Sequence, residues 1–121
     1  MPGLGVRCVS DQSWVTVAET SELVLALDAC GLRAQAAELF AVTGRLQHDD
    51  GSYWTGWQFA NQAHFPAERS SWTAAAVVLA ADALTGFSGG AAIFREIPAP
   101  VDTRSPADPE ACGCEAASAL S

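Results

Sequence analysis

The segment "SSWTAAAVVLAADAL" constrains the fold most, because it has helical character and no polar face. Only Thr73 and Asp82 interrupt its apolar side chains. Ser70 or Ser71 can cap its start and Gly86 can end it, so the pattern predicts a helix over residues 71–85. A helix that is apolar all round is buried on all sides. It needs more neighbours than two short helices supply.

Two further helices are predicted before it. Thr16 and Glu19 have the spacing of a capping box, in which each side chain satisfies a backbone amide of the first turn. The helix that starts there is expected over 16–30, and Gly31 is placed to end it. An apolar stripe then predicts a second helix over 32–47. A single glycine between two helical patterns is typical of an antiparallel hairpin.

The first and third predicted helices echo each other in sequence. "VLALDA", starting at Val24, and "VLAADA", starting at Val78, match at five of six positions. The cap residues Thr16 and Ser70 recur at the same offset. A repeated hairpin with a long connection suggests a stacked or ring-shaped array of helix pairs. The alternative is that Ala-Leu-Asp runs recur in helices by chance.

Composition limits the class of protein. The chain has 121 residues, which suits one domain, and its net charge of −8 disfavours nucleic acid or an anionic membrane surface as a partner. A signal peptide and a transmembrane run are both absent from the sequence pattern, so we expect a cytoplasmic protein. The segment 97–121 holds four of the six prolines and no aromatic residue. We therefore expect a domain over 1–96 and a disordered tail over 97–121, which carries the pair Cys112 and Cys114.

The connection between the second and third helices carries a family signature. "QHDDGSYW", from Gln47 to Trp54, resembles the Gln-x3-Gly-x-Trp motif of prenyltransferase and squalene-cyclase repeats, with Tyr53 at the position of the strict Trp. Over roughly residues 2–95 the chain resembles the C-terminal part of actinobacterial prenyltransferase-like toroid proteins. The resemblance implies an all-α fold: helical hairpins of a partial (α/α) toroid, about two repeat units, with a long aromatic loop.

Function follows from the same resemblance as an expectation. It implies part of a prenyltransferase or terpene-cyclase-like enzyme that is incomplete and inactive alone, with no cofactor. Self-association or a need for missing N-terminal repeats would cover its apolar helix. Two alternatives stay open. One is a carbohydrate-acting toroid of the six-hairpin glycosidase type, and the other is a non-catalytic remnant that packs on a partner. The ligand of a complete toroid would be an isoprenoid or a sugar accordingly.

Four residues of the connection are candidates for substrate binding: Trp54, Trp57, Arg69 and Trp72. Aromatic faces can hold an isoprenoid chain, stabilise a carbocation or stack on a sugar ring. Arg69 can hold a diphosphate or carboxylate. The structural alternative is that the aromatic rings clamp neighbouring repeats and that Arg69 forms a local ion pair with its neighbour Glu68.

Asp50 and Glu68 are the candidate catalytic residues, since a glycosidase needs two carboxylates and a diphosphate site needs a magnesium ligand. Asp49-Asp50-Gly51 is also ordinary turn chemistry, and the Asp-x-Asp-Asp acid motif of class II terpene cyclases is absent. Glu19 and Glu22 open the first helix, either as capping charges or facing the same cavity.

Three residues have the types and spacing of a zinc site, but the sequence disfavours one. Asp28 and Cys30 have the spacing found in protein prenyltransferases, and His64 is available as a third ligand. Asp82 repeats Asp28 without any cysteine, however, so the repeat explains Asp28 structurally. No metal is expected.

Overall fold

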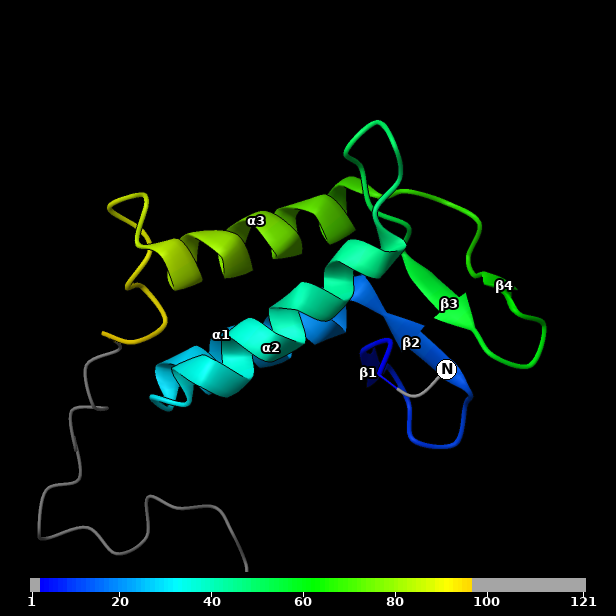
Figure 1. The fold of residues 1–121 in the computed structure, drawn as a ribbon, viewed down its shortest axis with the longest axis horizontal. Helices are drawn as coiled ribbons and strands as arrows, with labels where there is room; N and C mark the ends of the chain where they lie inside the picture. The colour runs from blue at the N-terminus through cyan, green and yellow to red at the C-terminus, as the bar shows by residue number, and fades with distance from the viewer. Residues whose placement is uncertain (1–2, 97–121) are drawn as a thin grey trace, which may run out of the picture.

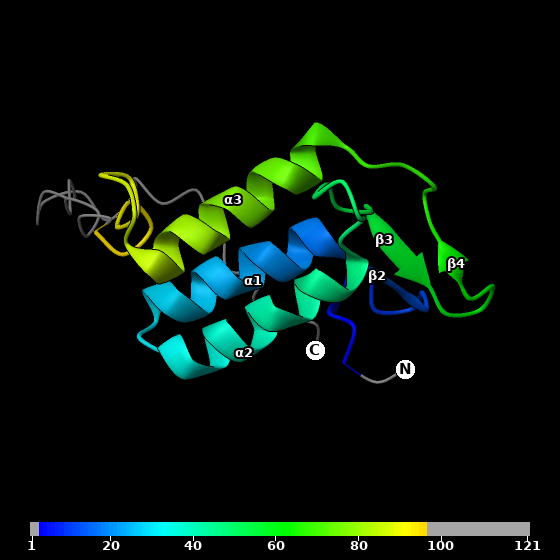
Figure 2. The ribbon, with the colours of Figure 1, turned by 45° about the horizontal axis from the view of Figure 1, so that its top comes forward.

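The computed structural model describes residues 3–96, and the predicted tail over 97–121 lies outside that range. Three helices lie side by side: α1 (Val17–Ala29), α2 (Arg33–Thr43) and α3 (Ser71–Thr85). Helix α1 packs against both of the others, as Figure 2 shows. None of the helices in this range is long and apolar enough to cross a lipid bilayer.

A four-stranded antiparallel sheet lies beyond one end of the helices (Figure 1). Its strands pair in chain order and are β1 (Val6–Arg7), β2 (Trp14–Thr16), β3 (Gly56–Gln58) and β4 (Ala63–His64). Strand β2 runs directly into α1, and both α1 and α2 are inserted between β2 and its partner β3. The sheet therefore holds the polypeptide before and after the helical hairpin together.

The fold is α+β, so the expected all-α toroid with no sheet of consequence is wrong. Each strand has only two or three residues, which is too short for an alternating pattern to stand out. The pairing of Trp14 with Gln58 also joins residues far apart in sequence, and no local signal encodes it. The aromatic connection, expected as a long loop of a toroid, is built around the hairpin of β3 and β4.

The predicted helix ends are confirmed in part. Gly31 and Gly86 have positive φ angles of 77° and 67° at the ends of α1 and α3. Ser70 caps α3, since its hydroxyl accepts a hydrogen bond of 3.2 Å from the amide of Thr73. The capping box differs from expectation, because the Thr16 hydroxyl donates to the carboxylate of Glu19 and does not accept a hydrogen bond from a backbone amide of the first turn. Helix α2 ends at Thr43 and continues as a short 3-10 turn, Gly44–Leu46.

Two apolar clusters form the core. One lies between the three helices and is centred on Val24, Ala36 and Ala80, which are fully buried. The other joins the helices to the sheet region through Val17, Leu46 and Val77. Small residues in α3 let it approach α1 closely, and the second cluster anchors the aromatic connection.

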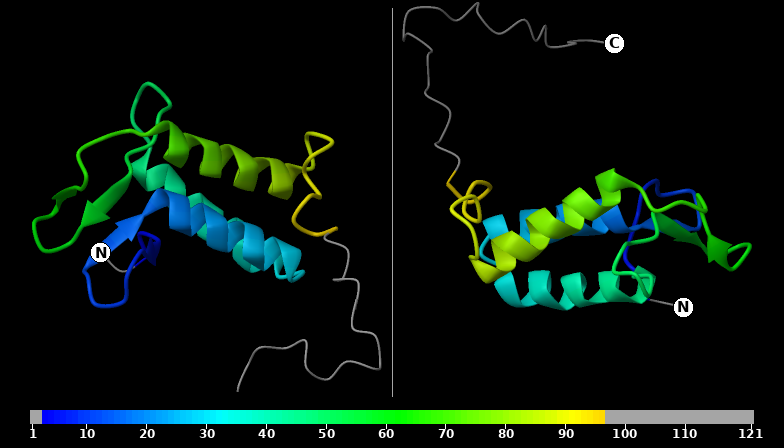
Figure 3. Two further views of the ribbon diagram at one scale, coloured as in Figure 1. Left: turned by 180° about the vertical axis from the view of Figure 1, so that it is seen from behind. Right: turned by 90° about the horizontal axis from the view of Figure 1, so that it is seen from above.

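A carboxylate–arginine cluster closes the other end of the helices, where residues 86–96 turn back (Figure 3). Asp28 is only 4% exposed. It accepts a hydrogen bond of 2.8 Å from Arg33 and a second one from Arg95. Arg95 also donates to the carbonyl of Ala83, so this cluster ties the segment after α3 to α1. Asp82, the sequence counterpart of Asp28, instead accepts hydrogen bonds from Ser88.

Helix α3 is not buried on all sides within the described structure. Thr73, Ala76 and Ala80 face the core, whereas Trp72 and Leu79 are 70% and 47% exposed. The sequence is apolar on both faces, but the neighbours described here cover only one of them.

Candidate functional site

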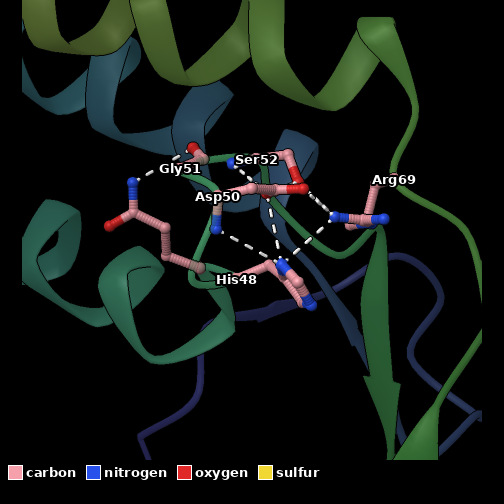
Figure 4. A network of polar contacts seen from close by, with 6 residues as sticks. His48, Asp50, Gly51, Ser52 and Arg69 are labelled. Carbon is pink, nitrogen blue, oxygen red and sulfur yellow. Dashed lines mark hydrogen bonds and ion pairs between the residues drawn. The ribbon is translucent and has the colours of Figure 1, made fainter.

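A cluster of polar side chains lies where the connection after α2 meets the start of α3 (Figure 4). His48, Asp50 and Ser52 come from the turn after the 3-10 segment, and Arg69 reaches them from just before α3. The turn depends on Gly51, whose φ angle is 86°, and the Gln47 amide donates to the Gly51 carbonyl over 3.1 Å. A glycine at this point allows the chain to reverse, which brings the three polar residues to one side.

Arg69 is the centre of this cluster. Its Nη1 donates to the carboxylate of Asp50 and to the Ser52 hydroxyl at 3.0 Å, and lies 3.2 Å from Nδ1 of His48. Asp50 also accepts from the Ser52 hydroxyl and amide. These hydrogen bonds from Ser52, followed by the one from Arg69, hold the pKa of the Asp50 carboxyl well below its usual range. The side chain of Asp50 is 54% exposed, so an ionised carboxylate is presented to solvent.

Aromatic rings lie beneath the polar cluster. The Arg69 guanidinium lies 5.4 Å from the ring centre of Trp54, a cation–π contact. His64 stacks on Trp54 with ring centres 4.3 Å apart and meets Trp57 edge-on at 5.2 Å. Both tryptophans also pack against the cluster around Val17. These contacts fasten the connection to the helices.

The predicted site residues fall into two places. The structure brings Asp50, Arg69 and Trp54 together, and Trp57 joins them through His64. Trp72 lies elsewhere, in a groove between α1 and α3 that Glu22 also lines. The side chain of Glu68 is exposed and makes no hydrogen bond or ion pair with residues 3–96, although its carbonyl accepts from the Thr55 amide.

Two members of the cluster were missed from the sequence. His48 and Ser52 flank the Asp49-Asp50-Gly51 turn, and an aspartate followed two residues later by serine is the pattern of an Asx turn. That pattern was a usable signal for the Asp50–Ser52 contact. Nothing in the local sequence indicated that Arg69 would reach the same turn.

The remaining titratable candidates have structural partners. Burial raises the pKa of Glu19, but hydrogen bonds from Thr16, its own amide and Cys8 outweigh that effect and lower it overall. The same contact with Glu19 raises the pKa of Cys8, which is exposed. Asp28 binds two arginines at the end of α1 remote from His64 (Figure 1). No three His, Cys, Asp or Glu side chains of residues 3–96 are grouped as metal ligands.

Comparison with known proteins gives one informative match. No protein-family profile matches the chain. The chain is 53% identical over 100 residues to the MMP endo-(1,4)-3-O-methyl-alpha-D-mannosidase of Mycolicibacterium hassiacum. The match includes 83% of this chain but only 28% of the relative, so the chain spans less than a third of the length of the curated relative that it matches.

This match corrects the expected function. The relative is a glycosidase, so the assignment to prenyltransferase-like and squalene-cyclase-like proteins is wrong. The carbohydrate-acting alternative agrees better with the match, although its toroid of hairpins is excluded for residues 3–96 by the sheet. The motif around Gly51 misled because a glutamine, a turn glycine and an aromatic residue can also stabilise a local turn. Gln47 here bonds to Gly51 within its own turn.

Proposed function

We propose that this chain contributes to a carbohydrate-acting enzyme, an endo-acting α-D-mannosidase whose substrate contains 3-O-methylated mannose. The observation that carries the proposal is the 53% identity over 100 residues to an enzyme of that description. Because the match spans 28% of that enzyme, the activity belongs to a protein of the relative's length and is not expected from residues 3–96 alone.

Within this proposal the polar cluster is the part that contacts the sugar. Asp50 offers an ionised carboxylate, and Arg69 and His48 offer further polar atoms, all partly exposed. Such groups hydrogen-bond to sugar hydroxyls. The low pKa of Asp50 makes it a weak base, so accepting hydrogen bonds from the substrate suits it better than proton transfer. Glu68, whose side chain is exposed and makes no hydrogen bond or ion pair with residues 3–96, is the better candidate for general acid–base work.

A chimera tests the proposal. The matched segment of the Mycolicibacterium hassiacum enzyme is replaced by the corresponding residues of this chain, and hydrolysis of 3-O-methylated mannose oligosaccharides is measured by product chromatography. We expect internal cleavage at a rate within about tenfold of the parent. A chimera that folds, as judged by circular dichroism and thermal melting, yet does not hydrolyse the substrate contradicts the proposal.

Substitutions in the chimera test the roles of Asp50 and Glu68. Asp50→Asn should raise KM about tenfold with a smaller effect on kcat, which is the cost of one charge-assisted hydrogen bond. Asp49→Asn is the matched control, because Asp49 is the exposed neighbour of Asp50 in the same turn. Equal effects of the two substitutions would remove Asp50 from the binding site. Glu68→Gln should lower kcat by at least about a hundredfold if Glu68 transfers a proton.

A further inference from the structure

A groove of about 330 Å³ lies between α1 and α3. Its walls are apolar and are formed by Leu25, Trp72, Ala75, Ala76, Leu79 and Phe94. Among residues 3–96, Glu22 is the one charged residue that lines it. Trp72, Leu79 and Phe94 are 70%, 47% and 39% exposed. Large apolar side chains thus face solvent together, not singly.

The apolar surface continues around α3. A second hollow of about 490 Å³ is lined by Val78, Leu79 and Phe87, with Val78 and Phe87 65% and 92% exposed. Helix α3 therefore presents apolar side chains on its outer faces over several turns. Contiguous exposed apolar surface of this kind marks an interaction site, whereas isolated exposed apolar residues do not.

A sugar is a poor occupant of this groove. Carbohydrate and other small polar ligands are held by several convergent hydrogen-bonding groups, and among residues 3–96 the groove offers only the Glu22 carboxylate and the Trp72 indole N–H. The polar cluster around Arg69 has the groups that the groove lacks. The groove instead matches the apolar face of a helix, because Trp72 to Leu79 extend over about two helical turns.

We propose that this groove binds another part of the same enzyme: an apolar helical segment that, in a protein of the relative's length, lies outside the matched region. This proposal rests on the proposed function. Nearly three quarters of the relative lies outside the match, so there is ample polypeptide to cover the groove. Because Glu22 lines the groove and the chain has a net charge of −8, we expect a lysine or arginine on the covering segment. A second copy of this chain would bring the same acidic excess, which disfavours it as the occupant.

The test compares surface accessibility in two proteins by hydroxyl-radical footprinting with mass spectrometry. The proteins are this chain alone and the chimera described above. Trp72 and Leu79 should react at least about fivefold more slowly in the chimera, because a covering segment excludes the radical. Leu32 is the internal control: it is 44% exposed, close to Leu79 at 47%, but lies in the turn between α1 and α2. Its reactivity should be the same in both proteins.

Leu79→Glu adds an independent measurement. In this chain alone the side chain is already half exposed, so the melting temperature should change little. In the chimera the new carboxylate would be buried near Glu22, and the melting temperature should fall by at least about 4 °C. Leu32→Glu should have a small effect in both. If the chimera does not fold, footprinting the unmodified mannosidase at the aligned positions supplies the same comparison.

Three results would overturn the proposal. Equal reactivity of Trp72 in both proteins would show that nothing covers the groove in the longer one. If Leu79→Glu and Leu32→Glu lowered the melting temperature of the chimera equally, Leu79 would be no more buried there than Leu32. A stable dimer of this chain that protects Trp72 would give the groove to a second copy. None of these readouts requires hydrolysis: an inactive chimera with a protected groove refutes the function alone, and an active one with an open groove refutes the interface alone.

Discussion

Two carboxylate–arginine clusters lie at opposite ends of the helices, and they differ in burial. Asp28 has a side-chain exposure of 3% and binds Arg33 and Arg95, while Asp50 has an exposure of 54% and binds Arg69. A buried carboxylate without partners carries a large desolvation cost, so the arginines around Asp28 are structurally necessary. An exposed pair in water contributes little to stability. The same chemistry therefore fastens the fold at one end and remains available to a ligand at the other.

The pairing of β2 with β3 holds the connection that carries the exposed cluster, and disrupting this pairing should have the largest effect on stability. A Cβ atom at Gly56 would lie 2.4 Å from the carbonyl oxygen of Val15, 2.6 Å from the Trp14 indole nitrogen and 3.0 Å from the Phe65 carbonyl. Gly56→Ala should therefore force β3 away from β2 and destabilise the chain by about 3 kcal/mol. Urea unfolding followed by circular dichroism measures this change.

Gly44→Ala is the matched control for that substitution. A Cβ atom at Gly44 meets nothing within 4 Å, and its φ of −59° suits any residue. It should leave stability unchanged or raise it by about 0.5 kcal/mol. A Gly56→Ala protein as stable as the Gly44→Ala protein would mean that the sheet does not hold the connection in place.

Removal of the buried carboxylate should have the next largest effect. Asp28→Ala leaves Arg33 and Arg95 without their shared partner, but their side chains are 54% and 32% exposed and can turn to water. We expect a loss of about 2 kcal/mol, below the 3–5 kcal/mol typical of a fully buried pair. Thermal unfolding at two salt concentrations measures it. Asp49→Ala, at an exposed position, should change stability by less than about 0.5 kcal/mol. Comparable losses from the two substitutions would contradict the structural role of Asp28.

The sequence predicted the helices well because their signals are local. The glycines at 31 and 86 and the serine at 70 mark helix ends through residues next to them in the chain. The sheet escaped prediction because β2 and β3 pair across two intervening helices. Asx-turn chemistry at Asp50 was readable, whereas the approach of Arg69 across 19 residues depends on how the whole connection folds. The exposure of Trp72 also depends on which neighbours surround α3, and no pattern within a helix records its neighbours.

The smallest expected effect concerns protonation of Asp50. Its pKa in the folded chain is below the ordinary value of 3.8, so its contacts favour folding at pH values above 3.8 and lose that contribution only as the pH falls through the lowered pKa. Stability near neutral pH should therefore be insensitive to pH as far as Asp50 is concerned. A carboxyl carbon NMR titration should show Asp50 ionised at pH values where ordinary aspartates are half protonated.

Two variants separate the causes of that lowered pKa. The hydrogen bond from the Ser52 hydroxyl is the largest single cause, ahead of either contribution of Arg69, and Ser52→Ala removes it while keeping the backbone amide bond, so we expect Ser52→Ala to raise the pKa of Asp50 more than Arg69→Ala does. The reverse order would mean that the arginine charge, not the Asx turn, holds the carboxylate ionised. In that case a ligand that competes for Arg69 would also change the protonation of Asp50, and the exposed cluster would respond to its ligand electrostatically. If Ser52 dominates, the turn itself keeps the carboxylate ionised, and a ligand that binds Arg69 would leave the charge of Asp50 unchanged.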